Sequence, residues 1–406
     1  MVKILHVAAV VTALALFAVH PGARTIGDEQ DSPAIKEVNA AFNAAQNLDH
    51  PEALAHARQA VALDPNSART HRGLASIIWI DLLFHRGAMT VDHYLGSIST
   101  NTITLPKPDP LLAAEFKGAL ARSIELAEKR ARQYPADAGA LFDVGAAYGV
   151  QAAYVASVEG SITQAFRYAR RAFETQSAVL VRDPSMASAG MIVGTYRYLI
   201  ASQPAYVRAL AFLAGFSGDK EKGIALLEVA SHDPMSRVDA KTALILIYSR
   251  EGRHNEALRL TRELQVELPR NRLFILEEGG AAIRAGRAGE AEAALTRGLA
   301  RFEEDTRPKI PGEHALWLYK RGLARLNLNH PADATSDLQR ALTVNPLPWV
   351  EGRIHVALGK LADLAGRRAE AKAEYAKALT SCNVGPDRVC QTEARTFLKL
   401  PFSFER

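Results

Sequence analysis

The stretch Tyr248–Pro269, with the sequence YSREGRHNEALRLTRELQVELP, decides the fold because similar stretches follow it along the chain. They begin at Gly286 (GRAGEAEAALTRGLARF), at His330 (HPADATSDLQRALTVNP) and at Gly366 (GRRAEAKAEYAKAL). In each stretch, alanine, leucine and other core residues recur three and four positions apart, which is the spacing of one helical face. The chain therefore repeats a helical unit at a fixed period.

Frames of 34 residues describe this repeat. The frames begin at Pro204, Val238, Arg272, Ala315 and Gly352. Their fifteenth position holds Gly218, Gly252, Gly286, Asn329 and Gly366. Gly, and after it Asn, adopts most easily the left-handed backbone that ends one helix before the next begins.

Other positions of the frame indicate how the two helices of a pair meet. The eighth and twentieth positions are small in most frames, as at Gly279 and Ala291, which indicates a close crossing. The twenty-fourth position, such as Leu295, shares a helical face with the twentieth. Pro269 and Pro346 end the second helix of their frames. The pattern predicts helices of about 12–14 residues, each ~20 Å long, in pairs that must stack to bury their apolar faces.

The residues at these recurring positions of the frame resemble the tetratricopeptide repeat (TPR) family over residues 204–385. The resemblance implies an all-α fold, a right-handed superhelical solenoid of helix-turn-helix repeats whose first helices line a peptide-holding channel. One departure concerns the usual aromatic residues of the first helix, because Trp317 lies one place early and only Tyr248 holds the usual tyrosine position.

The chain divides into several segments along its length. We expect a signal peptide over 1–23, a flexible linker over 24–33, an N-terminal TPR-like unit with a loop insertion over 34–110, divergent helical pairs over 111–203, TPR repeats over 204–385 and a C-terminal tail over 386–406.

The first segment indicates export to the periplasm or the medium. Lys3 precedes the apolar run Ile4–Val19, which is shorter than the ~20 residues of a membrane-spanning helix. Retention of the run as an N-terminal anchor is the alternative. The polar, proline-containing stretch within 87–110 predicts a long loop, which is either functional or a tolerated insertion.

Composition excludes several classes of protein. With 406 residues the chain exceeds a single ordinary core, and its 48% hydrophobic content excludes global disorder. The formal charge of +5 is small and spread out, so we expect no nucleic-acid partner. The two cysteines, Cys382 and Cys390, are predicted to form a disulfide in an oxidising compartment, with two free thiols as the alternative.

Motifs for catalysis are scarce. HExxH, GxSxG, GxGxxG and GxxxxGK[ST] are all absent, so we expect no enzyme activity and no cofactor. The best metal-like cluster is Asp81, His85, Asp92 and His93, which we interpret as local hydrogen bonding at helix ends beside the loop. A metal-dependent enzyme around Asp81, His85 and His93 is the second alternative function.

The channel positions implied by the TPR resemblance give the candidate site. They are Leu246, Arg250, Leu273, Leu276, Ile283, Arg284, Leu316, Tyr319, Leu323 and Leu326. The Lys and Asn of the best-known TPR carboxylate clamp are absent, which leaves an apolar channel with an arginine edge. We expect an exported scaffold that binds a protein or peptide on this face, with a small-molecule or glycan-binding protein as the first alternative.

Overall fold

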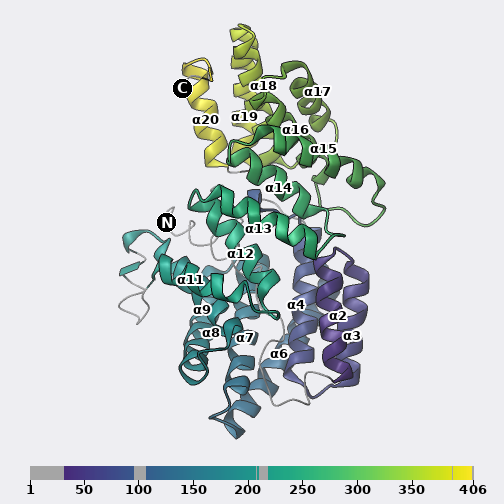
Figure 1. Ribbon diagram of the computed structural model, residues 1–406, viewed down its shortest axis with the longest axis vertical. Coiled ribbons are helices and arrows are strands. Elements are labelled where there is room, and N and C mark those ends of the chain that lie inside the picture. The colour runs from purple at the N-terminus through teal and green to yellow at the C-terminus, as the bar shows by residue number, and fades with distance from the viewer. Residues whose placement is uncertain (1–31, 96–106, 207, 210–217, 386, 405–406) are drawn as a thin grey trace. The chain divides into compact units, whose positions relative to one another are not determined.

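The computed structural model describes residues 32–95, 107–206, 208–209, 218–385 and 387–404. Every regular element in these ranges is a helix (Figure 1). The expected signal peptide over 1–23 lies outside the described residues, as does most of the expected linker. Within the described part of the chain, no helix combines the length and apolar character needed to cross a membrane.

The chain divides into two compact units. Unit 1 comprises Met1–Phe84 and Lys107–Ile247, and unit 2 comprises His85–Pro106 and Tyr248–Arg406. The boundary falls near the C-terminal ends of helices α4 and α12. Unit 2 therefore contains the repeats from Tyr248 onward together with a segment from the middle of the N-terminal half.

Unit 1 is built from consecutive packed helices. They are α2 (Pro33–Gln46), α3 (His50–Leu63), α4 (Ala68–His85), α6 (Pro110–Gln133), α7 (Ala138–Tyr154), the π-helix η1 (Val155–Glu159), α8 (Ile162–Arg182), α9 (Ala187–Ala201), α11 (Lys220–Ala230) and most of α12 (Arg237–Arg250). Helix α2 packs on α3, α6 on α7, α7 on α8, α8 on α9, and α9 on α11. In α3, Ala53, Ala57 and Ala60 are all buried, which lets α2 approach closely.

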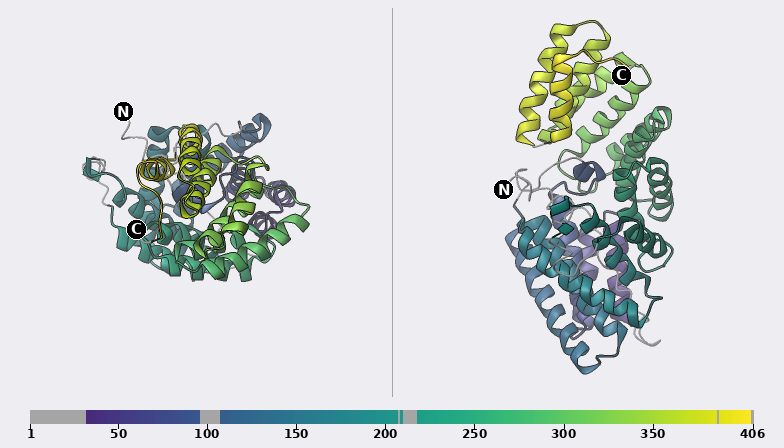
Figure 2. Two further views of the ribbon diagram at one scale, coloured as in Figure 1. Left: turned by 90° about the horizontal axis from the view of Figure 1, so that it is seen from above. Right: turned by 90° about the vertical axis from the view of Figure 1, so that its left-hand side faces the viewer.

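Unit 2 continues the pairwise arrangement. Its helices are the short α5 (Val91–Leu95), α13 (His254–Glu267), α14 (Leu273–Arg284), α15 (Ala288–Glu304), α16 (Glu313–Asn327), α17 (Pro331–Leu342), α18 (Pro348–Leu364), α19 (Arg368–Val384) and α20 (Arg388–Lys399). From α13 onward each helix packs on the next, and α14, α16, α18 and α20 also pack on one another in order (Figures 1 and 2). We call α14, α16 and α18 the inner layer.

The left-handed turn at the fifteenth position is confirmed in four of the five frames. Gly252, Gly286, Asn329 and Gly366 have φ angles of 75°, 72°, 58° and 73°. Each lies between the first and second helix of its pair, where a left-handed residue ends the first helix. Gly218, at the same position of the first frame, does not have a positive φ angle, so the prediction is wrong there; residues 210–217 before it lie outside the described residues.

The close crossing is also confirmed in the pairs that have glycine at the eighth position. A Cβ on Gly279 would lie 2.4 Å from Leu295 Cγ, and one on Gly322 would lie 2.8 Å from Leu338 Cγ. These pairs are the eighth and twenty-fourth positions of their frames. The glycine is therefore required because the large side chain of the second helix lies directly against the backbone of the first.

Two segments contain helices that the repeat pattern does not predict. The stretch expected to be a long loop between Phe84 and Leu111 contains α5, and Asp109 caps the helix that follows it, accepting from the N–H of Leu111 at 2.7 Å. The expected tail contains α20, which packs on α18 and α19. Neither helix belongs to the 34-residue frame, so periodicity could not reveal them.

A buried arginine joins consecutive repeats of unit 2. Arg272 is fully buried and donates to both carboxylate oxygens of Glu313, at 2.7 and 2.9 Å. It also donates to Asp305 at 2.9 Å and to the carbonyl of Pro308 at 2.8 Å. These bonds fix the connection between α15 and α16 to the start of α14.

Replacing Arg272 with Met is expected to lower the free energy of unfolding by about 3–5 kcal/mol, because the buried carboxylate of Glu313 loses its counter-charge. Chemical denaturation followed by circular dichroism measures the change. The control is Arg259→Met, at an exposed arginine paired with Glu263, and it should change stability by less than about 0.5 kcal/mol. Equal losses of unfolding free energy from the two substitutions would contradict the stabilising role assigned to Arg272.

Candidate ligand pocket on the inner layer of unit 2

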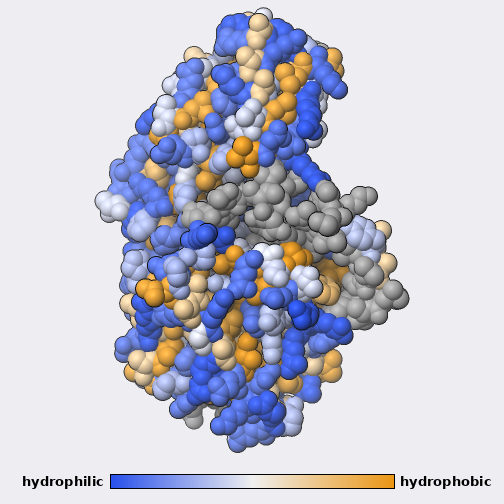
Figure 3. Space-filling model, turned by 180° about the vertical axis from the view of Figure 1, so that it is seen from behind, coloured by the Kyte–Doolittle hydropathy of each residue, from blue (hydrophilic) through white to orange (hydrophobic). Residues whose placement is uncertain are grey.

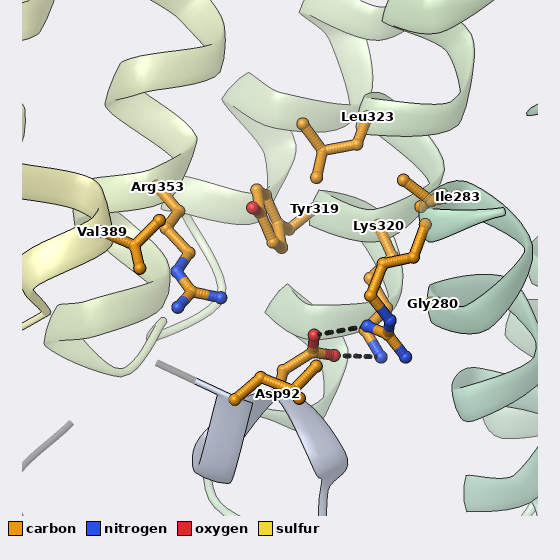
Figure 4. A pocket seen from close by; sticks show the side chains of 10 residues that line it. Asp92, Gly280, Ile283, Tyr319, Lys320, Leu323, Arg353 and Val389 are labelled. Atoms are coloured by element: carbon orange, nitrogen blue, oxygen red, sulfur yellow. Dashed lines mark hydrogen bonds and ion pairs between the residues drawn. The ribbon is translucent and has the colours of Figure 1, made fainter. Parts of the chain in front are cut away.

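A cavity of about 270 Å³ opens on the inner layer of unit 2. It is lined by Asp92 and Leu95 of α5, Gly280, Ile283 and Arg284 of α14, Tyr319, Lys320 and Leu323 of α16, Arg353 of α18, and Val389 of α20. Each successive inner helix thus contributes part of one wall, while α5 and α20 close two sides. Figure 4 shows Arg353, Tyr319 and Leu323 directed toward the same space, with Asp92 reaching in from α5.

A buried ion cluster forms the floor of the pocket. Lys320 is only 2% exposed, and its Nζ lies 2.5 Å from Asp92 Oδ2 and 3.7 Å from Glu277 Oε2. Arg284 Nη1 lies 3.0 Å from Asp92 Oδ1 (Figure 4). Lys320 also donates to the carbonyl of Leu276 at 3.2 Å. The pocket therefore already holds one carboxylate between two cations.

The local sequence makes room for this cluster. Gly279 and Gly280 are adjacent on α14, and each makes room for a different side chain. Gly279 accommodates Leu295, whereas a Cβ on Gly280 would lie 2.9 Å from Lys320 Nζ. The bare backbone at Gly280 thus lets the ammonium group approach Asp92.

Opposing influences set the ionisation of the two carboxyl groups. Burial alone would raise the pKa of Asp92, but Lys320 and Arg284 outweigh it and hold the pKa well below its usual range. For Glu277, burial dominates over the attraction of Lys320, and the nearby Asp92 adds to it, so its pKa is raised. Asp92 is consequently an anion at neutral pH.

The opposite wall offers free donors. Arg353 donates through Nε to Asp387 Oδ2 at 2.5 Å and lies 4.9 Å over the ring of Trp349. Its two Nη groups have no hydrogen-bond partner among the described residues, and neither has the hydroxyl of Tyr319. Burial raises the pKa of Tyr319, so its hydroxyl stays a neutral donor. Arg353 and Tyr319 can therefore bind an acceptor such as a carboxylate or a peptide carbonyl.

Apolar side chains complete the pocket. Leu95, Ile283, Leu323 and Val389 contribute its walls, and Val389 is 52% exposed. The combination of cationic donors and aliphatic walls suits a short segment that carries both an acceptor group and an apolar side chain.

Of the predicted channel residues, Ile283, Arg284, Tyr319 and Leu323 are brought together in this pocket. Arg250 instead donates to the carbonyl of Tyr94 at 2.5 Å. The remaining predicted residues are buried in the cores of their units and do not line the pocket, namely Leu246, Leu273, Leu276, Leu316 and Leu326.

Three members of this site, Asp92, Lys320 and Val389, were not among the channel positions predicted from the sequence. Asp92 appeared only in a metal-like cluster, and Val389 belongs to a helix outside the repeat. The adjacent glycines 279 and 280 are the one sequence signal that marks the place, because only the first is explained by the repeat.

The metal-like cluster does not assemble. Asp81 lies in unit 1, where its carboxylate is 3.5 Å from His50 Nδ1. His85 and His93 belong to unit 2, and His93 is buried. Within the described ranges, no group of three or more His, Cys, Asp or Glu side chains is placed to hold a metal ion.

The predicted disulfide between Cys382 and Cys390 is present, and both cysteines are buried. It joins α19 to α20, and Asp387 lies between the two cysteines in sequence. Asp387 accepts from the N–H groups of Val389 and Cys390 at 3.1 and 3.2 Å and also binds Arg353. The disulfide therefore fixes the segment that orients Arg353 toward the pocket.

Reducing this disulfide is expected to release two thiols and to lower the free energy of unfolding by about 2–3 kcal/mol, because a short loop of the unfolded chain is no longer closed. Thiol titration and denaturation with and without reductant measure both effects. The double substitution Cys382→Ala with Cys390→Ala is the control, since its stability should not respond to reductant. Two reactive thiols in the protein before reduction would contradict the bond.

His93 gives a pH-dependent prediction. Burial, aided by the charge of Arg86, lowers its pKa from 6.5 to about 4. The unfolded chain then binds more protons than the folded chain between these values. Stability is therefore complete above about pH 6.5 and falls on the order of 3 kcal/mol as pH drops toward 4.

Two measurements check this prediction. The His93 imidazole should titrate near pH 4 by NMR, and His93→Asn should flatten that part of the stability profile. His330→Asn, at an exposed histidine, should leave the profile unchanged. A His93 titration near 6.5 would contradict the prediction.

Comparisons with known proteins show similarity of architecture at low sequence identity. No protein-family model matches the chain, and no curated protein matches it. Similar solved structures include a tetratricopeptide repeat protein from Parabacteroides merdae (12% identity, 80% of this chain and 98% of that chain, TM-score 0.32). They also include yeast Tom70 (10% identity, 91% and 89%, TM-score 0.38) and the human IFIT1 dimer with m7Gppp-AAAA (13% identity, 98% and 87%, TM-score 0.42). The chain is thus similar to TPR-like helical repeat proteins.

Proposed function

We propose that this chain is an exported, non-catalytic scaffold that binds a short segment of a protein or peptide partner in the pocket on the inner layer of unit 2. The observation that carries the proposal is the pocket itself, where three consecutive inner helices present donors and aliphatic walls to one space. A repeat scaffold recognises partners through such a row of side chains because successive helices place them at regular intervals.

The chemistry of the pocket favours a segment with an acidic or carbonyl acceptor beside an apolar side chain. Arg353 and Tyr319 supply donors, and Leu323 and Ile283 supply the aliphatic contact. A cavity of about 270 Å³ is at the small end of ligand pockets, which are roughly 300–1,000 Å³. It therefore suits one or two anchoring side chains of a longer partner.

The same features disfavour a glycan-binding protein. Sugar sites commonly use an accessible aromatic face, but Trp79, Trp317 and Trp349 are all fully buried. Tyr319 is the one aromatic residue that lines the described pocket, and it is itself mostly buried.

Recognition through a broad hydrophobic surface has less support. On the face in Figure 3, the coloured, described residues show hydrophobic and hydrophilic side chains interspersed without one broad apolar band. The proposed recognition therefore relies on a few anchors in a pocket.

Export is part of the proposal. The charged start and short apolar run of the first residues are typical of a secretory signal. The buried Cys382–Cys390 disulfide supports an oxidising compartment.

Site-specific photo-cross-linking tests the function. With a benzoylphenylalanine in place of Leu323, we expect the chain to form a covalent adduct with its partner in the cells that produce it. The matched control has the same cross-linker in place of Val266, an 82% exposed residue of α13 in the same unit. An adduct that forms equally from both positions would contradict pocket recognition.

A second substitution tests the donors. Arg353→Gln combined with Tyr319→Phe should weaken partner binding by ~10-fold or more, because a charge-assisted hydrogen bond contributes roughly 1.5–3 kcal/mol. Titration calorimetry with the partner identified by cross-linking measures the change. Arg301→Gln on α15, away from the pocket, is the control, and equal affinity of all three proteins would reject the assigned role.

A further inference from the structure

Helix α5 has the properties of a bound peptide. It is only five residues long, far too short to be a stable helix by itself. The chain on both sides of His85–Pro106 belongs to unit 1, whereas this segment belongs to unit 2. Contacts with other residues of unit 2, most of them on the inner layer, therefore hold α5 in its conformation.

These contacts bind both the backbone and the side chains of α5, as the contacts of a peptide-binding site do. The N–H of Val91 donates to Glu277 Oε1 at 2.9 Å, and the carbonyl of Tyr94 accepts from Arg250 Nη2 at 2.5 Å. Between them, the carboxylate of Asp92 is held by Arg284 and Lys320.

Apolar anchors flank the carboxylate. Val91 and Tyr94 are buried, and Leu95 lines the pocket. The hydroxyl of Tyr94 donates to the carbonyl of Ala88 at 2.7 Å, which closes the segment on itself. The segment thus carries an acidic residue with Val91 before it and, after His93, Tyr94 and Leu95.

Several buried polar atoms at this contact lack hydrogen-bond partners among the described residues. They include Thr90 Oγ1, both ring nitrogens of His93, and Nε and Nη2 of Arg284. Each such atom has lost solvation without full compensation, which opposes docking of the segment. The docked segment therefore has its charge paired by Lys320 and Arg284, but some of its hydrogen-bonding groups remain without partners within the described part of the chain.

We propose that Val91–Leu95 is an internal ligand of the inner layer, and that the partner displaces it with a segment of the same kind, an acidic residue between apolar ones. This inference rests on the proposed function of the pocket, because it names what competes for that site. Asp92 and Leu95 are pocket residues already, so a partner carboxylate held by Lys320 and Arg284 must take the place of Asp92.

The test uses the full chain with Asp92→Arg, which places a third cation beside Arg284 and Lys320 and expels the segment. The probe is a fluorescently labelled, end-blocked peptide with the sequence of Ala88–Leu95, AMTVDHYL. By anisotropy, we expect it to bind the variant at least ~10-fold more tightly than the unsubstituted chain. A peptide with Asn in place of Asp should bind the variant at least ~10-fold more weakly. Equal binding of the peptide to both chains, or no binding to either, would overturn the inference.

The matched control is Asp333→Arg, which makes the same charge change at an exposed position of α17. It should bind the probe as the unsubstituted chain does. Probe binding that rises equally in this control would show a general charge effect and would overturn the inference.

A measurement on the unsubstituted chain covers the case in which Asp92→Arg does not fold. Amide hydrogen exchange of Val91–Leu95 should be at least ~10-fold faster than that of the core amides of α16, because the segment opens without unfolding of unit 2. Equal protection of both would make α5 a fixed part of the core and overturn the inference.

The cross-linker at Leu323 separates this inference from the proposed function. The Asp92→Arg chain should give a higher yield of adduct than the unsubstituted chain. An equal yield from both would reject the internal ligand and leave partner binding in place, whereas no adduct from either, with no probe binding, would reject both.

Discussion

The fold of the repeats depends on a close crossing between the two helices of each pair. In three pairs of unit 2, a glycine on the first helix faces a large side chain of the second, as Gly359 faces Tyr375, where a Cβ would lie 2.4 Å from the ring. Any side chain at that position would push the helices apart. Because the same contact recurs with the same left-handed turn, successive pairs have similar geometry and their first helices align in one layer.

The pocket combines this regular layer with two irregular additions. The repeats place Ile283, Tyr319 and Arg353 on consecutive helices, but repeats alone would leave an open face. Helix α5 adds a carboxylate, and α20 adds Val389 and the aspartate that orients Arg353. The specificity of the site thus comes from α5 and α20, which lie outside the 34-residue repeat. The repeated helices determine where these two segments can pack.

This division explains how much could be predicted. Spacing alone predicted the helix pairs, the left-handed turns and the buried columns, because backbone geometry and close crossing restrict those positions to few residue types. Channel positions transferred from the TPR family were less informative. Leu276 and Leu316, for example, are buried core residues. Nothing in the periodicity could bring Asp92 to Lys320, since their contact joins a five-residue helix to a repeat far along the sequence.

The ion cluster is better understood through binding than through stability. Buried ion pairs seldom stabilise a fold more than apolar residues of similar volume, because desolvation offsets their attraction. Lys320 is nevertheless buried beside Asp92, with Gly280 making room for it. If Asp92 leaves, Lys320 and Arg284 each lose their nearest carboxylate in a poorly solvated site. That state is unfavourable unless another carboxylate arrives, so the cluster favours exchange of one acidic segment for another over an empty pocket.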